Sequence, residues 1–203
     1  MSKLIPRKSS AIMYKRVIEY LRKIRPFMVS RQRAAHIQRM EEDSVKLFPK
    51  LSEFDAERLL VATCAHDLFR DVEPGKLVKI SKIWNLKITK VEAFAPVLLH
   101  GKVASEYLKR RIKINDEEIL DAVSYHTSGM ATDSLIVKSL VILDTLEHGR
   151  KFDGVGKLRT IAKRSVDEGY IAVIKNKIVY ALNNTLLILP QTVEAWNFSR
   201  GVR

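Results

Sequence analysis

The sequence predicts an all-α protein that folds as a single domain. Apolar residues recur at the three- and four-residue spacing of amphipathic helices along nearly the whole chain, and the alternation typical of strands never extends beyond a few residues. The 203 residues contain no internal repeat, no low-complexity segment and no Gly/Ser-rich linker that would separate two domains. A chain of this length is sufficient to bury one sizeable hydrophobic core.

Two helices are expected in the N-terminal quarter of the chain. The first covers residues 12–24, and Pro26 is expected to end it because proline lacks the amide hydrogen that a helix needs. Ser30 is placed to cap the second helix, and Pro49 stops it.

The remaining elements are also expected to be helices. Asp55 opens a third helix that runs into the sequence CAHDLFRD at 64–71, and Pro74-Gly75 then indicates a loop. Further helices are expected at 90–112, 116–126, 133–148, 155–166 and 167–183, with a short one after Pro190.

Most of the positive charge lies near the N-terminus. Of the formal net charge of +13, residues 1–40 contribute +10, from four Lys and seven Arg against the single acid Glu19. Residues 1–12 are expected to be a basic tail in front of the domain, which spans 13–203. A basic stretch can bind nucleic acid, but no RNA-binding motif or row of stacking aromatic residues accompanies it. The solvated face of a helix plus a short tail is the favoured interpretation.

The cysteine content and the hydropathy bear on where the protein works. Cys64 is the single cysteine, so no disulfide can form within the chain, and a reducing cytoplasm is the expected location. No apolar run approaches the roughly 18 to 20 residues that span a bilayer. The N-terminal MSKLIPRKSS is not followed by the apolar segment of a signal peptide. We therefore expect a cytoplasmic protein without a membrane partner.

Several histidines fall where a buried metal site would need them. Four of the five continue an apolar helix face or stand at a helix end: His36, His66, His100 and His126. The fifth, His148, lies next to Gly149 and is expected to be exposed. A single histidine in such a position is more often an ordinary core or surface residue, so the interpretation depends on what accompanies the four.

Asp144 is the companion that favours a metal site. The apolar stripe of the helix at 133–148 includes Leu140 and Val141, and its next positions are Asp144 and Glu147. A buried carboxylate is costly unless a metal ion or another cation compensates its charge. Imidazoles combined with carboxylates favour Fe, Mn, Zn or Ni over Ca or Mg, and the lack of thiolates argues against a structural zinc.

The order H…HD…H…H…D resembles that of the HD-domain metal-dependent phosphohydrolases. The residues around each position look like those of the YqeK-type subfamily, the bacterial symmetrical diadenosine tetraphosphatases. The resembling segments are RAAH (33–36), AHDLFRD (65–71), LLHGKVASEYL (98–108), AVSYHTSG (122–129), LDTLEHGRKFDGVGKLRTIA (143–162) and LPQTVEAWN (189–197). Together they extend from about residue 14 to 200, in the same order as in the family.

This resemblance implies a single HD-domain helical bundle with a buried dinuclear metal site. It implies that one ion is bound by His36, His66, Asp67 and Asp144. The second ion would be held by His100 and His126, with Asp67 bridging the two. The resemblance implies two divalent ions, iron first, with Mn, Zn or Ni as alternatives.

The same resemblance implies hydrolysis of dinucleoside polyphosphates. A metal-activated hydroxide would cleave diadenosine tetraphosphate symmetrically into two ADP. Asp67, Arg70 and Arg150 are the expected catalytic residues, and Arg70 stands where the family commonly has lysine. The residues expected to bind the substrate are Arg70, Lys102, Thr127, Gly129, Arg150 and Arg159.

Several alternatives stay open at this point. For Arg33 a surface role and a phosphate-binding role are equally expected, and Glu147 could either orient a ligand or pair with Arg150. The activity could belong to an HD nucleotidase or phosphodiesterase acting on another nucleotide. A basic nucleic-acid-binding protein that retains the HD scaffold is a third interpretation. Apolar residues at 171–178 could belong to the core or to a homodimer interface.

Overall fold

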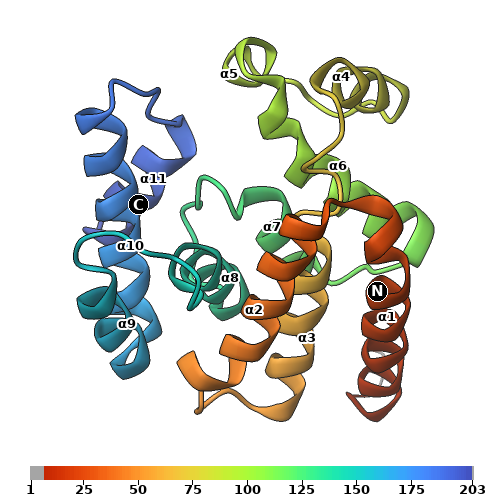
Figure 1. Ribbon diagram of the computed structural model, residues 1–203, viewed down its shortest axis with the longest axis horizontal. Helices are drawn as coiled ribbons and strands as arrows, with labels where there is room; N and C mark the ends of the chain where they lie inside the picture. The colour runs from red at the N-terminus through yellow and green to blue at the C-terminus, as the bar shows by residue number, and fades with distance from the viewer. Residues whose placement is uncertain (1–6, 203) are drawn as a thin grey trace.

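The computed structural model describes residues 7–202, and this part of the chain contains helices and no strand, as predicted. The termini of the described part lie on different sides of the molecule (Figure 1). The helical elements are α1 (Arg7–Met28), α2 (Arg31–Leu47), α3 (Glu53–Ala65), α4 (Pro74–Ile83), α5 (Lys90–Phe94), η1 (Pro96–Leu98), α6 (Leu99–Tyr107), η2 (Leu108–Ile112), α7 (Glu117–Tyr125), α8 (Leu135–Leu146), α9 (Val155–Arg164), α10 (Val166–Asn183) and α11 (Pro190–Ser199).

Helices α2, α3, α7 and α8 form the centre of the bundle. Helix α1 packs on α3, whereas α9, α10 and α11 form the opposite side (Figure 1). This side contacts the centre mainly where α10 packs on α8, and α9 also contacts α2 and α8. Helices α4 and α5 lie above the centre, where α4 contacts α6. No described helix is long and apolar enough to cross a membrane.

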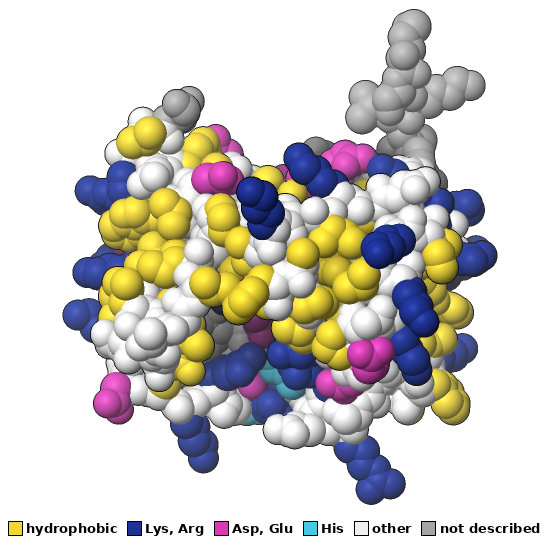
Figure 2. Space-filling view, turned by 90° about the horizontal axis from the view of Figure 1, so that it is seen from above, with side chains coloured by type: hydrophobic (Ala, Val, Ile, Leu, Met, Phe, Trp, Pro, Cys, Tyr) yellow, Lys and Arg dark blue, Asp and Glu magenta, His cyan; other side chains and the backbone are white. Residues whose placement is uncertain are grey.

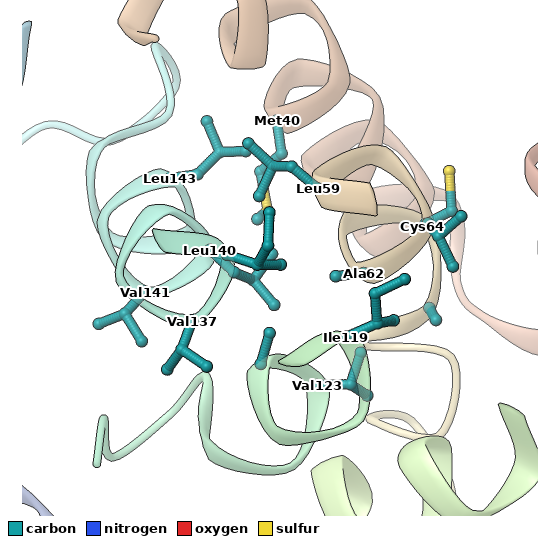
Figure 3. Packing of buried hydrophobic residues seen from close by; sticks show 14 of the residues in the cluster. Met40, Leu59, Ala62, Cys64, Ile119, Val123, Val137, Leu140, Val141 and Leu143 are labelled. Atoms are coloured by element: carbon teal, nitrogen blue, oxygen red, sulfur yellow. The ribbon is translucent and has the colours of Figure 1, made fainter. Parts of the chain in front are cut away.

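The hydrophobic core joins the central helices. Met40 of α2, Leu59 of α3, Ile119 of α7 and Leu140 of α8 are all fully buried, and their side chains converge in Figure 3. Burying a large apolar side chain contributes roughly 1.5–3 kcal/mol. The core therefore fixes how these four helices pack against one another, and this packing determines where their polar residues meet.

Two prolines do not act as predicted. Helix α1 continues through Pro26 to Met28, because a proline in the last turn removes only one hydrogen bond before the helix ends. Pro74 opens α4 instead of belonging to a loop. It occupies the first turn, where its missing amide hydrogen has no helical partner, and the Glu73 side chain caps the amides of Gly75 and Lys76.

The helix expected at 90–112 is in fact four elements, from α5 to η2. The break falls at Ala95, whose backbone is non-helical (φ −124°, ψ 75°), because the residue before a proline is disfavoured in the helical region. His100 consequently lies in the first turn of a new helix, α6. The expected tail at 1–12 overlaps α1, which begins at Arg7, and residues 1–6 lie outside the described part.

Candidate metal centre

The structure brings together the six residues predicted as metal ligands. His36 lies on α2, and the pair His66-Asp67 follows the end of α3. His100 lies in α6, His126 follows α7, and Asp144 is in the last turn of α8. The four histidines and Asp67 are each at most 5% exposed. Figure 2 shows histidine side chains in a recess of the surface, between Lys/Arg and Asp/Glu side chains.

Asp67 lies at the centre of the cluster. Its Oδ1 is 3.2 Å from His100 Nε2 and 3.5 Å from His126 Nε2. Its Oδ2 is 3.5 Å from His66 Nε2 and 3.9 Å from His36 Nε2. The ligand atoms thus form two groups of three, each within 4.8 Å, that share Asp67. One carboxylate can therefore contact an ion in each group.

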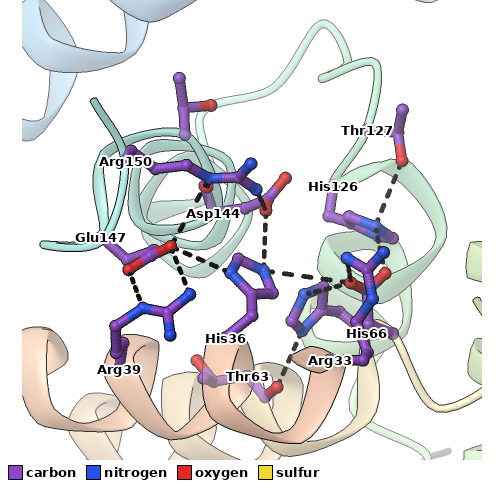
Figure 4. Close-up of polar contacts among 12 residues, drawn as sticks. Arg33, His36, Arg39, Thr63, His66, His126, Thr127, Asp144, Glu147 and Arg150 are labelled. Atoms are coloured by element: carbon purple, nitrogen blue, oxygen red, sulfur yellow. Dashed lines mark hydrogen bonds and ion pairs between the residues drawn. The ribbon is translucent and has the colours of Figure 1, made fainter. Parts of the chain in front are cut away.

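Asp144 extends the first of these groups. Its Oδ1 lies 3.2 Å from His36 Nε2, on the side of the imidazole that faces the cluster (Figure 4). The pKa of Asp144 is held below its usual range; burial raises it, but the imidazole of His36 and the charge of Lys177 outweigh burial. Asp144 is therefore an anionic donor at the edge of the site, as predicted from its position on the apolar stripe.

Hydrogen bonds orient all four imidazoles. Nδ1 of His66, His100 and His126 donates to the backbone carbonyl three residues earlier, over 2.6–2.8 Å. Nδ1 of His36 lies 3.3 Å from Oε1 of Glu147. Because Nδ1 carries the hydrogen in each neutral ring, the lone pair of Nε2 points into the cluster.

This orientation fits bound cations. Nε2 of His100 and Nε2 of His126 are only 3.0 Å apart, and in the neutral rings neither carries a hydrogen. Nε2 of His66 is buried and has no hydrogen-bond partner among the described residues. Facing lone pairs repel, and a buried acceptor without a partner is costly. Divalent cations would bind these lone pairs, which would remove both the repulsion and the cost of the unpaired acceptor. Imidazole with carboxylate is a donor set that transition metals prefer.

Charges near Asp67 keep it ionised. Burial raises the pKa of Asp67, but contact with His66, His100 and His126 lowers it well below its usual range when their imidazoles are protonated. Arg33 adds a further positive charge, because its Nη1 donates to Asp67 Oδ2 over 2.7 Å. Arg33 therefore lies at the cluster, and its expected role in phosphate binding stays a prediction.

Glu147 orients His36 from behind. Its Oε1 contacts His36 Nδ1, and its Oε2 accepts from Arg39 Nε and from the amide of Gly149, both over 2.6 Å. Glu147 Oε1 is 3.7 Å from Arg150 Nε. Of the two roles left open for Glu147, orienting His36 corresponds to the shorter distance, 3.3 Å to His36 Nδ1 against 3.7 Å to Arg150 Nε. Arg39 was not among the predicted site residues, although its position one helical turn after His36 was a usable signal.

The predicted cationic residues occupy different positions. Arg150 lies at the site, where its Nη2 donates to Asp144 Oδ1 over 3.0 Å (Figure 4). Arg159 donates to three backbone carbonyls between residues 146 and 150 and so anchors the segment after α8. Lys102 pairs with Glu92 at 2.7 Å, away from the cluster. Arg70 is partly buried in the loop that begins at His66.

The loop after α7 contributes one polar side chain to the site. Thr127 Oγ1 lies 3.2 Å from His126 Nε2. Gly129 adopts φ +72°, and a Cβ there would lie 2.6 Å from Ile174 and 2.7 Å from the hydroxyl of Tyr170. Glycine is therefore required for the turn and for its close packing on α10.

Lys177 is a site residue that the sequence analysis missed. It lies on α10, donates from Nζ to the carbonyl of Thr127 over 3.1 Å, and interacts electrostatically with Asp144. Burial lowers the pKa of Lys177, while Asp144 acts in the opposite direction. A lysine inside the apolar segment IAVIKNKIVY was the available signal.

Comparison with known proteins agrees with this geometry. The family model of the HD domain matches residues 33–149, which is more than half of the chain and includes all six clustered residues. The chain belongs to the HD-domain family. A solved structure, a predicted HD superfamily hydrolase involved in NAD metabolism from Clostridium acetobutylicum, superposes on this HD-domain protein with a TM-score of 0.81. The two are 26% identical, and the alignment covers 94% of this chain and 98% of the other.

Two relatives carry the name bis(5'-nucleosyl)-tetraphosphatase, symmetrical. The protein from Staphylococcus aureus is 25% identical over 89% of this chain and 93% of its own length. The protein from Halalkalibacterium halodurans is 30% identical over 73% of this chain and 79% of its own. Within the HD domains, this protein therefore groups with the symmetrical bis(5'-nucleosyl)-tetraphosphatases.

Proposed function

We propose that this HD-domain protein is a metal-dependent phosphohydrolase that cleaves diadenosine tetraphosphate symmetrically into two ADP. The observation that carries the proposal is Asp67, whose two oxygens each face a different pair of imidazoles. Such a shared carboxylate can bind two neighbouring ions at once, and paired ions are a common arrangement in enzymes that act on phosphate esters. The substrate follows from the relatives named as symmetrical tetraphosphatases.

The residues divide between two ions. His36, His66, Asp67 and Asp144 would hold one ion, and Asp67 with His100 and His126 would hold the other. We propose iron as the native metal, as the family resemblance implies, with Mn, Zn or Ni as alternatives. Imidazole and carboxylate ligands suit all four metals. When bound, the two ions would lower the pKa of a water molecule and polarise a phosphoryl oxygen.

The protein's own cations would bind the polyphosphate. Arg33 and Arg150 contact Asp67 and Asp144, so they border the two ends of the first ligand group. Lys177 lies between Asp144 and Thr127, and Arg70 follows Asp67 in its loop. Charged donors of this kind make short, strong hydrogen bonds to phosphate and can stabilise the charge that develops on it.

Three of the expected substrate residues receive another role in this proposal. Lys102 forms an ion pair with Glu92, and Arg159 donates hydrogen bonds to backbone carbonyls. Gly129 packs closely against side chains of α10. We therefore propose that these three shape the site. The residues proposed to contact the substrate are Arg33, Arg70, Thr127, Arg150 and Lys177. This division predicts that substitutions in the second set raise the KM without unfolding the protein.

Metal content and product analysis test the proposal together. The protein, purified without chelator, should contain two transition-metal ions per chain and convert diadenosine tetraphosphate into ADP as the sole nucleotide product. Asp67→Ala should lose both ions and the activity. His148→Ala is the matched control, because His148 is half-exposed and contacts Asp43 outside the cluster. Retention of metal and activity in Asp67→Ala would refute the shared role of Asp67.

The same assay separates the alternatives. Two ions without ADP formation would indicate a nucleotidase or phosphodiesterase acting on another nucleotide. Salt-sensitive nucleic-acid binding that survives Asp67→Ala would favour the basic binding protein. A homodimer and a cytoplasmic location remain predictions.

A further inference from the structure

One face of α1 carries cations and aromatic rings that take no part in the metal centre. Four residues at successive intervals of four, three and four positions form a single stripe along the helix: Arg16, Tyr20, Lys23 and Phe27. All four are exposed, Phe27 by 88% and Tyr20 by 44%. Helix α1 lies at the edge of the bundle, on the side opposite α9 and α10 (Figure 1). The stripe therefore faces solvent.

A groove lies beside this stripe. It has a volume of about 520 Å³, and residues of α1 and η2 line it. Arg16 and Tyr20 contribute to the lining together with Arg111 of η2, and no acidic residue of the described chain does. The hydroxyl of Tyr20 lies 3.2 Å from that of Tyr107, which directly precedes η2. The stripe and Arg111 thus form one continuous surface, which we call the α1–η2 face.

The three cations of the α1–η2 face have no acidic partner. Elsewhere on α1, Lys15 pairs with a glutamate of α3 and Arg22 with a glutamate of α2. Within the described residues, Arg16, Lys23 and Arg111 form no ion pair. Exposed cations on a common face attract a chain of phosphates, because each contact releases counterions that were condensed on that chain. The face therefore fits a polyanion.

The aromatic rings indicate that this polyanion has bases. Tyr20 and Phe27 are seven residues apart, about 10.5 Å along the helix axis, and the same separation holds for Arg16 and Lys23. Surfaces that bind single-stranded nucleic acid combine rings, on which bases stack, with cations that contact the phosphates. Such rings were not apparent from the sequence, because the exposure of Tyr20 and Phe27 depends on how α1 packs.

A membrane surface fits this face less well. A helix that lies on a membrane buries its apolar face at the boundary between head groups and acyl chains. In α1 the apolar face is already buried in the core, where Val17 and Leu21 are 8% and 0% exposed. The outward stripe that remains mixes rings with cations and so presents no continuous apolar surface for insertion.

We propose that the α1–η2 face binds single-stranded RNA. Its three cations contact phosphates, and its two rings stack on bases. RNA presents loops and ends whose unstacked bases can lie on aromatic side chains. No residue of the face is a ligand of the candidate centre or a proposed substrate contact, so this function goes beyond hydrolysis and does not depend on it.

Fluorescence anisotropy with a labelled oligouridylate of about 20 nucleotides tests the role of the cations. Three phosphate contacts predict that the logarithm of the affinity falls against the logarithm of the salt concentration with a slope of about −2.1. The wild type should therefore lose about 18-fold in affinity between 50 and 200 mM salt. In the triple variant Arg16→Gln/Lys23→Gln/Arg111→Gln, the slope should approach zero.

A matched control removes the same charge from another surface. Lys157→Gln/Lys163→Gln/Lys175→Gln changes three exposed lysines of α9 and α10, and it should keep the wild-type affinity and slope. A wild-type slope in the α1–η2 variant, or an equal loss in both triple variants, would overturn the proposal. Because all six positions are exposed, both variants should melt at the wild-type temperature.

The rings have a different signature from the cations. Phe27→Leu should weaken binding about 5- to 100-fold at constant salt, the range expected for the loss of one stacked base, and should leave the slope unchanged. Phe94→Leu is its control, because Phe94 is 79% exposed on α5, away from the face. Duplex RNA should bind the wild type and Phe27→Leu equally, since its paired bases cannot reach the ring. An unchanged affinity of Phe27→Leu for the single strand would overturn the proposal.

Two other polyanions identify the occupant of the face. Vesicles that contain phosphatidylglycerol should not retain the protein, and poly-glutamate should displace the oligouridylate only in large excess. Vesicle binding that is lost in Phe27→Leu would assign the face to a membrane. Displacement by poly-glutamate at an equal concentration would assign it to an acidic protein. Either result would overturn the proposal.

Hydrolysis provides the independent readout. The α1–η2 variant and Phe27→Leu should form ADP from diadenosine tetraphosphate at the wild-type rate, so RNA binding beside ADP formation would establish two functions in one chain. A wild type that forms ADP and binds no RNA would overturn this inference and leave the proposed function intact. A wild type that binds RNA through this face and forms no ADP would do the reverse.

Discussion

Gly101→Ala should loosen the metal centre by separating two helices. Gly101 directly follows His100 in α6, and its Cα faces the backbone of α7. A Cβ at this position would lie 2.8 Å from the carbonyl oxygen of Val123 and 2.9 Å from that of Ser124. The shorter distance is 0.6 Å below the 3.4 Å at which ordinary contact begins. Both neighbours are backbone atoms, so only a movement of one helix can relieve the clash.

The size of the effect follows from that geometry. Forcing an extra methyl group into a well-packed interior costs about 1–3 kcal/mol, which for a domain of this size lowers the Tm by about 2–12 °C. His100 lies in α6 and His126 directly follows α7, so the two residues would separate with these helices; their Nε2 atoms are 3.0 Å apart. A displacement of this order exceeds the roughly 0.2 Å tolerance of metal–ligand distances. The second ion should therefore be lost first.

Thermal unfolding and metal analysis of the purified variant measure both effects. Gly156→Ala is the matched control, because Gly156 lies in α9 and a Cβ there would meet no atom within 4 Å. Alanine favours helices over glycine by about 1 kcal/mol, so the control should keep or raise the Tm and keep its metal. If Gly101→Ala has the wild-type Tm and metal content, the close approach of α6 and α7 does not position His100.

Two further substitutions test other parts of the structure. Glu147→Gln should weaken metal binding about 10–100-fold, the usual effect of losing the carboxylate behind a ligating histidine, as measured by competition with a chromophoric chelator. Asp116→Asn should lower the free energy of unfolding by about 1.5–3 kcal/mol, the usual value of a hydrogen bond to a charged group, as measured by urea denaturation. Asp116 pairs with Arg58 at 2.7 Å and accepts from Tyr14, and Arg58 keeps its other ion pairs in the variant. Burial raises the pKa of Asp116, but Arg58 outweighs burial and keeps it lowered. The stability difference between wild type and Asp116→Asn should therefore be constant above the unfolded pKa of about 3.9 and shrink as the pH falls below it.

Each of these predictions has a clear failure. Unchanged metal affinity in Glu147→Gln would mean that the contact with His36 does not orient the imidazole. Asparagine can still accept the hydrogen bond from Ile119 that caps α7, so Asp116→Asn removes the charge and keeps the cap. A stability difference that stays constant as the pH falls below about 3.9 would assign the effect to packing rather than to the ion pair.

Local sequence signals were misleading at two prolines, Pro26 and Pro74. Pro49 follows the end of α2 and Pro190 opens α11, as predicted. Pro26, Pro74 and Pro96 are chemically alike, yet one lies inside a helix, one opens a helix and one follows a break. The difference depends on which partners the backbone groups around each proline hydrogen-bond to, and the local sequence does not determine those partners. The helix periodicity itself was a reliable guide, because an amphipathic stripe needs only local spacing to be recognised.

The sequence by itself determined the helical class, the family resemblance and the six clustered residues. Histidines that continue apolar faces, and Asp144 on an apolar stripe, had to lie inward because their neighbours are buried there. Only the tertiary structure decided that each oxygen of Asp67 faces its own histidine pair. It also decided that Arg39 and Lys177 reach the site. These contacts join helices far apart in the chain, and their geometry depends on how the core packs, which no local spacing encodes.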